Sequence, residues 1–548
     1  MENFLTPPIK YVILGKKGRK MTSTSDKKTR LLKYWHEIQP LINQGYCLLD
    51  KEVIMNLPGP CMPCFSESEN IGIGSPYGKG AARVWAFFDK SVDKILLGPS
   101  GRVKKESSYS PYMSETELNP FFIPPEFLVE RKLIMQKTLD NYYRLPKNPQ
   151  ETDYELVEKT FALLLHRAWK NSHSQLSEGA FIQELTKQAF QTTDYPYIGD
   201  MQIQVPYSVV QAHPEAFLTD FTLGTDGDSF CPKGSNWGFA FFHPKKLFTK
   251  DGLGIAGRIW KDLLSDTLVG AKAGVRIDHF IAYVNPYLFS LNPKIPNGRL
   301  FSSPNHPIFK KYAYQQEEDF YRIIDKILLP VCRENHLEAM QIYAEDIGAR
   351  PPQMEKVMRH FGLGRLLVSQ FKVPSCPTHL YQINRAKYED VVALDTHDLP
   401  SVQMFFDSLN DNQRFQHAIN MAGSLRFHYT DYLKSTEQLT RMQWAEALTC
   451  PAKRVQAFFT SWTGQKGRYN VPGAPGKWNL RCDIHFDDLY FTNLLLGRAY
   501  NPLDAIALAI FARGDSFYQA HAAFVARLHT AEDTLKHLIQ EWLRNNTV

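Results

Sequence analysis

From about Gly45 onward, short runs of apolar residues alternate with stretches in which apolar residues recur at helical spacing. Apolar runs of roughly four to eight residues predict buried strands, whereas recurrence every three to four positions predicts helices. The clearest helical patterns cover residues 155–191 and 515–545, and the apolar run at 505–512 fits a buried helix or strand. The alternation of the two patterns predicts an α/β protein.

Four of the strand-like runs share a feature that periodicity alone does not predict, because each ends abruptly in carboxylates. The four runs end at Asp200, at Asp278, at Glu345 with Asp346, and at Asp395 with His397 and Asp398. A strand of a parallel sheet is buried on both faces, so a charge at its end must emerge at the carboxyl edge of the sheet. In barrels of parallel strands the active site lies at that edge. We therefore expect these acids to lie close together.

The intervals between the acids indicate the fold class. One βα unit takes roughly 30 residues, and the interval from Glu345 to Asp398 suits two such units with a strand near 366–371 between them. The earlier intervals are longer and require inserted structure. We therefore predict an α/β fold of the (β/α)8 TIM barrel type, in which insertions form subdomains on the loops at the carboxyl end of the strands. The main insertions are expected within 100–190 and 285–335.

Length and charge agree with one large catalytic unit. The chain has 548 residues, of which 43% are hydrophobic and 22% charged, and it contains no long low-complexity tract that would mark a domain boundary. Its net charge of +6 arises from the basic residues between Lys16 and Arg30. We therefore expect a basic, flexible arm over residues 1–30 and a single, nearly neutral catalytic barrel over residues 31–548.

Composition also excludes several classes of protein. A nearly neutral body gives no electrostatic case for binding nucleic acid or an anionic membrane. No apolar run approaches the roughly 20 residues of a membrane-spanning helix. Cys61 and Cys64 form a C-x-x-C pair, but no second pair completes a zinc site. We therefore expect a cytoplasmic protein that binds neither nucleic acid nor a membrane, and the oligomeric state stays open.

Several carboxylates at one edge of a barrel suit three chemistries: a divalent metal site, proton abstraction beside a carbonyl, or glycosyl transfer. The neighbouring residues help to choose among them. Arg276 lies two positions before Asp278, so both side chains point to the same face, and the guanidinium favours an ionised nucleophile over a nearby metal ion. Glu345 follows Tyr343 and Ala344 with no cation beside it. In such a setting burial raises a carboxyl pKa toward that of a general acid.

Three of these segments resemble a known family. Residues 276–280 read R-I-D-H-F, residues 344–348 read A-E-D-I-G, and residues 396–398 read T-H-D. These segments are similar, in order and approximate spacing, to strand-end motifs of the 4-α-glucanotransferases (amylomaltases or disproportionating enzymes), glycoside hydrolase family 77 of the α-amylase clan. Further similar segments run along almost the full chain, among them S-P-Y at 110–112 and A-H-P-E at 212–215. The resemblance implies an enzyme that moves α-1,4-linked glucan segments between maltooligosaccharides.

The resemblance also implies a role for each residue in the matched motifs. Asp278 would be the nucleophile, Glu345 the general acid and base, and Asp398 a third acid that stabilises the transition state. The residues that would bind the substrate are Arg276, His397, Asp200, Tyr112 and Trp237. In a retaining mechanism the two reacting carboxyls lie about 5 to 5.5 Å apart and a covalent glucosyl-enzyme forms. Neither a metal nor an organic cofactor is expected.

The chain departs from the family pattern at four places, one of which is Tyr207-Ser208 where the family has Asp-Ser. Gln202 stands where the family usually has a proline after Gly-Asp-Met, residues 227–238 differ from the usual lid, and residues 281–283 read I-A-Y in place of R-G-F. Exclusion of water depends on the lid, so a hydrolase of the same clan that uses the same acids stays open as an alternative. An inactive glycan-binding protein is a third hypothesis, and the retention of all three acids argues against it.

Overall fold

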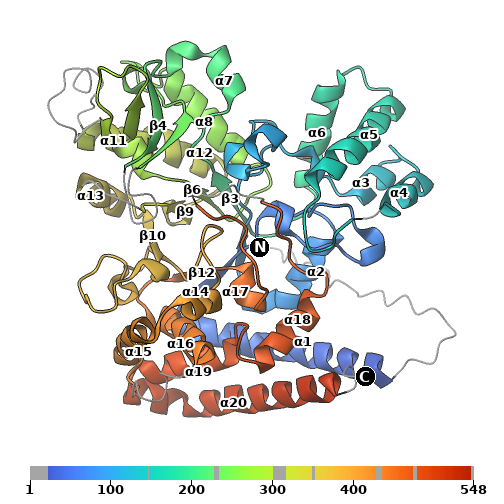
Figure 1. Cartoon of the computed structure of the whole chain (residues 1–548), viewed down its shortest axis with the longest axis vertical. Helices are drawn as coiled ribbons and strands as arrows, with labels where there is room; N and C mark the ends of the chain where they lie inside the picture. Colours follow the sequence, from blue (N-terminus) through green and yellow to red (C-terminus); the bar gives the residue numbers. More distant parts are fainter. Residues whose placement is uncertain are drawn as a thin grey trace, which may run out of the picture.

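In the residues that the structure describes, eight parallel strands form a closed barrel at the centre of the molecule (Figure 1). The structure is a computed structural model, and it describes residues 23–544 except 146, 227–233, 300–315, 348–351, 428–434 and 473–477. In order around the barrel the strands are β1 (Glu52–Asn56), β2 (Lys94–Leu96), β3 (Tyr197–Met201), β6 (Gly274–Ile277), β9 (Ile342–Ala344), β10 (Gly364–Val368), β11 (Val391–Ala393) and β12 (Arg454–Phe458). The prediction of a (β/α)8 barrel is confirmed.

Side chains from successive strands fill the interior of the barrel. Ile54 of β1, Leu96 of β2, Ile198 of β3 and Leu366 of β10 belong to one cluster of buried residues, separate from the two larger clusters that pack against helices. Residues two positions apart on a strand face the same side. The interior therefore holds an apolar plug, and polar residues at the carboxyl ends of the same strands lie above it.

The helical and strand patterns of the sequence correspond to elements of the structure. The pattern at 155–191 forms α5 (Tyr154–Ser172) and α6 (Glu178–Phe190), and the pattern at 515–545 forms α20 (Asp515–Leu543). The four runs that end in acids are β3, β6, β9 and β11, and β10 is the strand expected near 366–371. These expectations are confirmed.

A layer of helices closes the lower side of the barrel, where α20 packs on α1 and α19, and α16 packs on α19 (Figure 1). The helices outside the insertions are α1 (Ser23–Leu49), α2 (Lys79–Phe88), α8 (Ile255–Thr267), α13 (Pro352–His360), α14 (Val402–Ser408), α15 (Asp411–Leu425), α16 (Thr436–Thr449), α17 (Phe459–Thr463), α18 (Phe486–Leu495), α19 (Pro502–Ala512) and α20. Among the described residues, none of the helices combines the length and the hydropathy that crossing a membrane would require.

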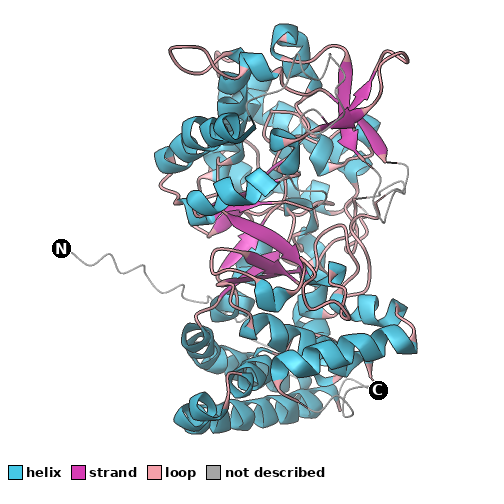
Figure 2. Ribbon diagram, turned by 90° about the vertical axis from the view of Figure 1, so that its left-hand side faces the viewer, coloured by secondary structure: helices cyan, strands magenta, loops and turns pink. Residues whose placement is uncertain are grey.

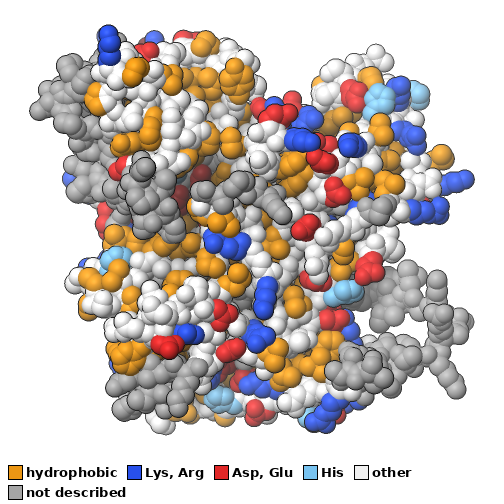
Figure 3. Space-filling model, in the orientation of Figure 1, with side chains coloured by type: hydrophobic (Ala, Val, Ile, Leu, Met, Phe, Trp, Pro, Cys, Tyr) orange, Lys and Arg blue, Asp and Glu red, His pale blue; other side chains and the backbone are white. Residues whose placement is uncertain are grey.

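Insertions after β2, β3 and β6 build two lobes above the barrel (Figure 1). The first lobe follows β2 and contains α3 (Pro125–Glu130), α4 (Gln136–Tyr143), α5 and α6. The second contains α7 (Tyr207–Ala212), α9 (Ile281–Val284), α11 (Gln316–Ile323), α12 (Leu329–Glu334) and the strands β4 (Phe221–Thr225), β5 (Ser235–Phe239), β7 (Tyr287–Ser290) and β8 (Gly298–Arg299). Figure 3 shows an open notch between the lobes, with charges of both signs scattered over this face.

The second lobe has its own antiparallel sheet, in the order β5-β4-β7-β8, which Figure 2 shows apart from the barrel strands. Its strands come from two different insertions, because β4 and β5 follow β3 whereas β7 and β8 follow β6. We expected the main insertions within 100–190 and 285–335. The structure adds the inserted strands β4 and β5 between residues 221 and 239, of which β4 pairs with β7 of the later insertion.

Part of the stretch that we expected to be an arm over residues 1–30 is helical. Residues 23–30 form the first turns of α1. Lys28 holds this end of the helix, because its Nζ lies 2.6 Å from Asp488 Oδ1. The expectation of a flexible arm is therefore corrected for residues 23–30, and residues 1–22 lie outside the described part of the chain.

Candidate active site

The strand register explains why the predicted residues meet. β3 pairs with β6 so that Asp200 lies directly beside Arg276. β6 pairs with β9 so that Ile277 lies beside Ala344, and the residues that follow these two are Asp278 and Glu345. Local strand geometry therefore brings three carboxylates and one guanidinium to the carboxyl ends of three neighbouring strands.

Arg276 links these three acids. Its Nη1 donates to both carboxylate oxygens of Asp200, at 2.8 and 2.9 Å, and its Nη2 donates to Asp278 Oδ1 at 3.0 Å. The same Nη2 lies 3.8 Å from Glu345 Oε2. Burial alone lowers the pKa of Arg276, but the carboxylates of Asp200 and Asp278 outweigh burial and hold this pKa well above its usual value. The charged guanidinium of Arg276 therefore contacts Asp278 and lies close to Glu345.

Glu345 lies in a setting that favours its protonated form. Its Oε2 accepts a hydrogen bond from the backbone N–H of His279 at 2.8 Å, and its Oε1 accepts one from the N–H of Ile347 at 3.0 Å. Burial raises the pKa of Glu345 to about 7, and the charge of Asp278 adds to this rise, whereas Arg276 and the two N–H groups oppose it. At neutral pH a large share of Glu345 therefore carries a proton that it can donate.

Asp398 has the opposite character. His397 Nε2 lies 3.3 Å from its Oδ2, and Asn470 Nδ2 donates to its Oδ1 at 2.6 Å. Partial burial works to raise the pKa of Asp398, but His397 and Asn470 outweigh it and lower this pKa to about 2. The side chain is 39% exposed. Asp398 is therefore an ionised and accessible acid, able to accept hydrogen bonds from the hydroxyls of a ligand.

Tyr112, on the segment that follows β2, contacts this polar cluster at two residues. Its hydroxyl donates to Asp200 Oδ2 at 2.7 Å and lies 3.2 Å from His397 Nδ1. Its ring stacks on the His397 ring with centroids 4.5 Å apart and planes 14° apart. Tyr112 therefore connects Asp200 on β3 with the segment after β11 that carries His397.

Trp237 lies on β5 of the second lobe. Its ring meets the ring of His279 edge-on, with centroids 4.9 Å apart. His279 directly follows Asp278, so Trp237 joins the site at the side of the antiparallel sheet. The neighbouring lid residues 227–233 lie outside the described residues.

The structure thus links seven of the eight residues named from the sequence through direct contacts and places Trp237 against His279, and it adds two that were not named as site residues. Asn470 bonds to Asp398, and the ring centroid of Trp478 lies 5.9 Å from that of Tyr112. Both follow β12 on a long loop. Their signal in the sequence is a further resemblance to the family, because residues 470–473 read N-V-P-G and are followed by Trp478, as in a late segment of its pattern.

The arrangement can perform glycosyl transfer. An ionised carboxylate and a protonated carboxyl on either side of a sugar are the two groups that a retaining reaction needs. In the described part of the chain no group of three or more His, Cys, Asp and Glu side chains is arranged to hold a metal ion. Among the three chemistries considered from the sequence, the positions of Asp278 and Glu345 favour glycosyl transfer.

Comparisons with known proteins point to the same chemistry. The family model described as 4-alpha-glucanotransferase matches residues 180–486. The structure is similar to an amylomaltase from Streptococcus agalactiae in complex with acarbose, with 15% identity and a TM-score of 0.60, over 82% of this chain and 99% of that chain. It is also similar to an amylomaltase from Corynebacterium glutamicum, with 13% identity and a TM-score of 0.59, over 88% of this chain and 76% of that chain. A comparison with curated proteins found no match.

Proposed function

Because the matched family model spans more than half of its length, the chain belongs to the 4-alpha-glucanotransferase family, and we propose that it transfers α-1,4-glucan segments between maltooligosaccharides by a retaining double displacement. The observation that carries this mechanism is the position of Arg276 Nη2, 3.0 Å from Asp278 and 3.8 Å from Glu345. Because one guanidinium nitrogen lies near both carboxyls, the two are close enough to act on the same glycosidic bond, as a retaining mechanism requires.

In the first half of the reaction Glu345 is the acid and Asp278 the nucleophile. Glu345 gives its proton to the glycosidic oxygen while an oxygen of Asp278 bonds to C1 of the sugar and the C1–O bond to the leaving chain breaks. Arg276 donates a direct hydrogen bond to Asp278 Oδ1 and so fixes the position of its carboxyl group. The product is a glucosyl ester of Asp278 and a free chain that ends in a 4-hydroxyl.

The second half reverses these roles. When Asp278 becomes an ester it loses its negative charge, and that charge is one of the causes that raise the pKa of Glu345. The pKa of Glu345 therefore falls, and its carboxylate becomes a base that takes the proton from the 4-hydroxyl of an acceptor glucan. The acceptor oxygen bonds to C1 and frees Asp278. Water in place of the acceptor would give hydrolysis.

The remaining residues hold the sugar and its developing charge. Asp398 is ionised and exposed, so it accepts hydrogen bonds from sugar hydroxyls that strengthen as positive charge develops on the ring. His397 and Tyr112 form a flat stacked pair beside Asp200. Trp237 stands on the lobe that faces the acceptor chain and offers it a stacking surface.

The proposed function is tested with maltotriose as the only substrate. We expect glucose plus a ladder of longer oligomers, because transfer conserves the number of glycosidic bonds. Chromatography of the products, together with an assay of reducing ends over time, distinguishes the alternatives. A steady rise in reducing ends would support the hydrolase instead, and the absence of any reaction would leave a glycan-binding protein.

A pH profile tests the role of Glu345. We expect kcat for transfer to fall about tenfold for each pH unit above pH 7, because Glu345 must carry a proton and its pKa is about 7. Asp398, with a pKa of about 2, stays ionised throughout the range. The measurement is kcat on maltotriose from pH 5 to 9, with circular dichroism at each pH as a control for unfolding. A constant kcat up to pH 9 would contradict the assignment.

A further inference from the structure

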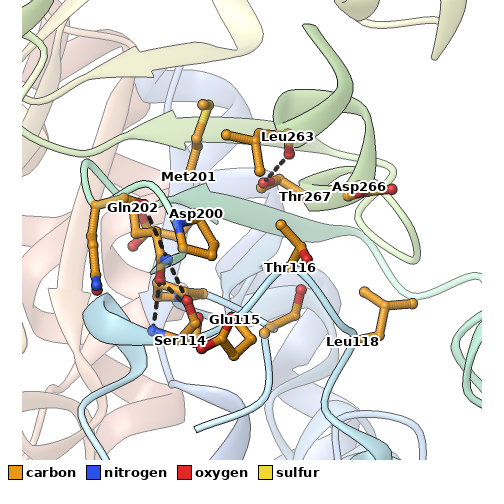
Figure 4. Close-up of a pocket in the computed structure, with 15 residues that line it drawn as sticks. Ser114, Glu115, Thr116, Leu118, Asp200, Met201, Gln202, Leu263, Asp266 and Thr267 are labelled. Carbon is orange, nitrogen blue, oxygen red and sulfur yellow. Dashed lines mark hydrogen bonds between the residues drawn. The ribbon is translucent and has the colours of Figure 1, made fainter. Parts of the chain in front are cut away.

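Gln202 ties the end of β3 to the loop that carries Tyr112. Its Oε1 accepts hydrogen bonds from Ser114 Oγ at 2.7 Å and Ser114 N at 3.2 Å, and its Nε2 donates to the Ser114 carbonyl at 2.8 Å. The Nε2 also donates to the carbonyl of Gln204 at 3.2 Å. We call the hydrogen bonds between Gln202 and Ser114 the tether. Figure 4 shows the side chains of these two residues pointing toward each other, beside Asp200. The amide of Gln202 thus grips Ser114 by its hydroxyl and both of its backbone groups.

The tether lies next to the hydrogen bond between Tyr112 and Asp200 in the active site. Ser114 lies two residues after Tyr112, and Gln202 lies two residues after Asp200. Tyr112 bonds to Asp200, and Ser114 bonds to Gln202, so the same two segments are joined twice. Ser114 directly follows the short 3-10 turn Pro111–Met113 that carries Tyr112. A fixed Ser114 therefore limits how far Tyr112 can move away from Asp200.

Two other side-chain tethers of this loop are attached farther along the chain from Tyr112 than Ser114 is. Gln183 of α6 grips Leu118 through its Oε1 at 3.0 Å and its Nε2 at 3.1 Å, and Ser208 Oγ donates to Glu115 at 2.9 Å. Neither tether comes from β3 or from the residues directly after it. The proline that the family usually has at position 202 offers no side-chain hydrogen bond, so this link is a property of the present chain.

We propose that Gln202 is a positioning residue for glucan transfer. By fixing Ser114 it holds the Tyr112 hydroxyl against Asp200, and the two carboxylate oxygens of Asp200 orient Arg276. Arg276 in turn contacts the nucleophile Asp278. Catalysis is sensitive to small misplacements of such groups, because transition-state contacts need defined distances. This inference rests on the proposed function, since it acts through the same catalytic residues.

The first test is Gln202→Ala, with Gln183→Ala as the matched control. Gln202→Ala is expected to lower kcat on maltotriose about 10- to 100-fold, with a smaller change in KM, because the loss is one of alignment. Gln183→Ala removes an amide tether of the same kind from the same loop, so it is expected to leave kcat within about twofold, since Tyr112 keeps its tether. Ser114→Ala keeps the two backbone bonds to Gln202 and is expected to show a smaller loss than Gln202→Ala.

The decisive measurement is a double-mutant cycle with Tyr112→Ala. If Gln202 acts by placing Tyr112, then adding Gln202→Ala to the Tyr112→Ala variant lowers kcat by less than about twofold. If its role is general support of the fold, the two losses multiply, and the proposal is overturned. Wild-type kcat in the single variant Gln202→Ala overturns it as well.

Two further readouts separate the possible failures. Full activity of Tyr112→Ala would contradict the proposed site itself, whereas an impaired Tyr112→Ala with an unaffected Gln202→Ala would contradict only the tether. Gln202→Leu keeps a similar volume without hydrogen bonds, and it replaces the alanine variant if that variant does not fold. Its kcat is expected to fall by the same factor, and thermal unfolding of each variant shows that the protein measured is folded.

Discussion

Asp278→Asn is expected to lower kcat for glucan transfer by about 10⁴-fold or more, which is the scale of loss when a covalent nucleophile is removed. The amide of asparagine has the size of the carboxylate, but it lacks the negative charge that attacks C1. Its oxygen can still accept the hydrogen bond that Arg276 Nη2 donates to Asp278 Oδ1 at 3.0 Å. The variant should therefore fold and bind glucans while turnover is lost, as measured by initial rates on maltotriose and by thermal unfolding.

Asp395→Asn serves as the matched control for this variant. Asp395 is also a buried acid that follows a barrel strand, but its oxygens accept from Phe458 N at 2.7 Å and Ser461 Oγ at 2.6 Å. These bonds join β11 to β12 and α17, so the substitution should lower stability while kcat per folded molecule changes little. Retention of more than about 1% of wild-type kcat by Asp278→Asn would show that Asp278 is not the nucleophile.

Glu345→Gln is expected to lower kcat on maltotriose about 10²- to 10⁴-fold, the usual range for loss of a general acid. The side chain of glutamine can accept a hydrogen bond from the N–H of His279 or Ile347, but it has no acidic proton to give to a departing sugar oxygen. A glucosyl donor with a fluoride leaving group needs no such proton. The loss in the first half of the reaction should therefore be much smaller with a glycosyl fluoride than with maltotriose, as measured by the release of fluoride.

The same variant should accumulate the covalent intermediate. Formation of the ester from a fluoride proceeds without the acid, but its transfer to an acceptor needs Glu345 as the base. Mass spectrometry of the digested protein should find the sugar on the peptide that contains Asp278. The double variant with Asp278→Asn should carry no sugar. An equal loss of rate with both donors, or a sugar on a different peptide, would exclude the proposed role of Glu345.

The barrel and its acids were predictable because both leave local signals in the sequence. A strand buried on two faces needs a continuous apolar run, so the abrupt carboxylates at Asp200, Asp278 and Glu345 stand out. The positions of these acids at adjacent strand ends then follow from parallel pairing. The roles of the individual acids came from the resemblance of their motifs to a family, and the experiments above test those roles.

The antiparallel sheet of the second lobe was not predictable in this way. β4 pairs with β7, so Phe221 lies opposite Ser290, although the two strands belong to insertions after different barrel strands. Such pairing is set by long-range contacts, and short strands in long loops carry little local pattern. For the same reason the contact of Asn470 with Asp398 appears only when the loop after β12 is seen to return over the site.

Residue type and spacing along the chain were sufficient to indicate the barrel and the strand-end acids, because buried strands and their ends are local features of a sequence. The family was indicated by the resemblance of three of these segments to its motifs. Only the tertiary structure decided that burial and the charge of Asp278 raise the pKa of Glu345 to about 7, while His397 and Asn470 lower that of Asp398 to about 2. It also decided that Gln202 grips Ser114. Solvation, charge and hydrogen bonding act through space, so their effects depend on which distant segments the fold brings together.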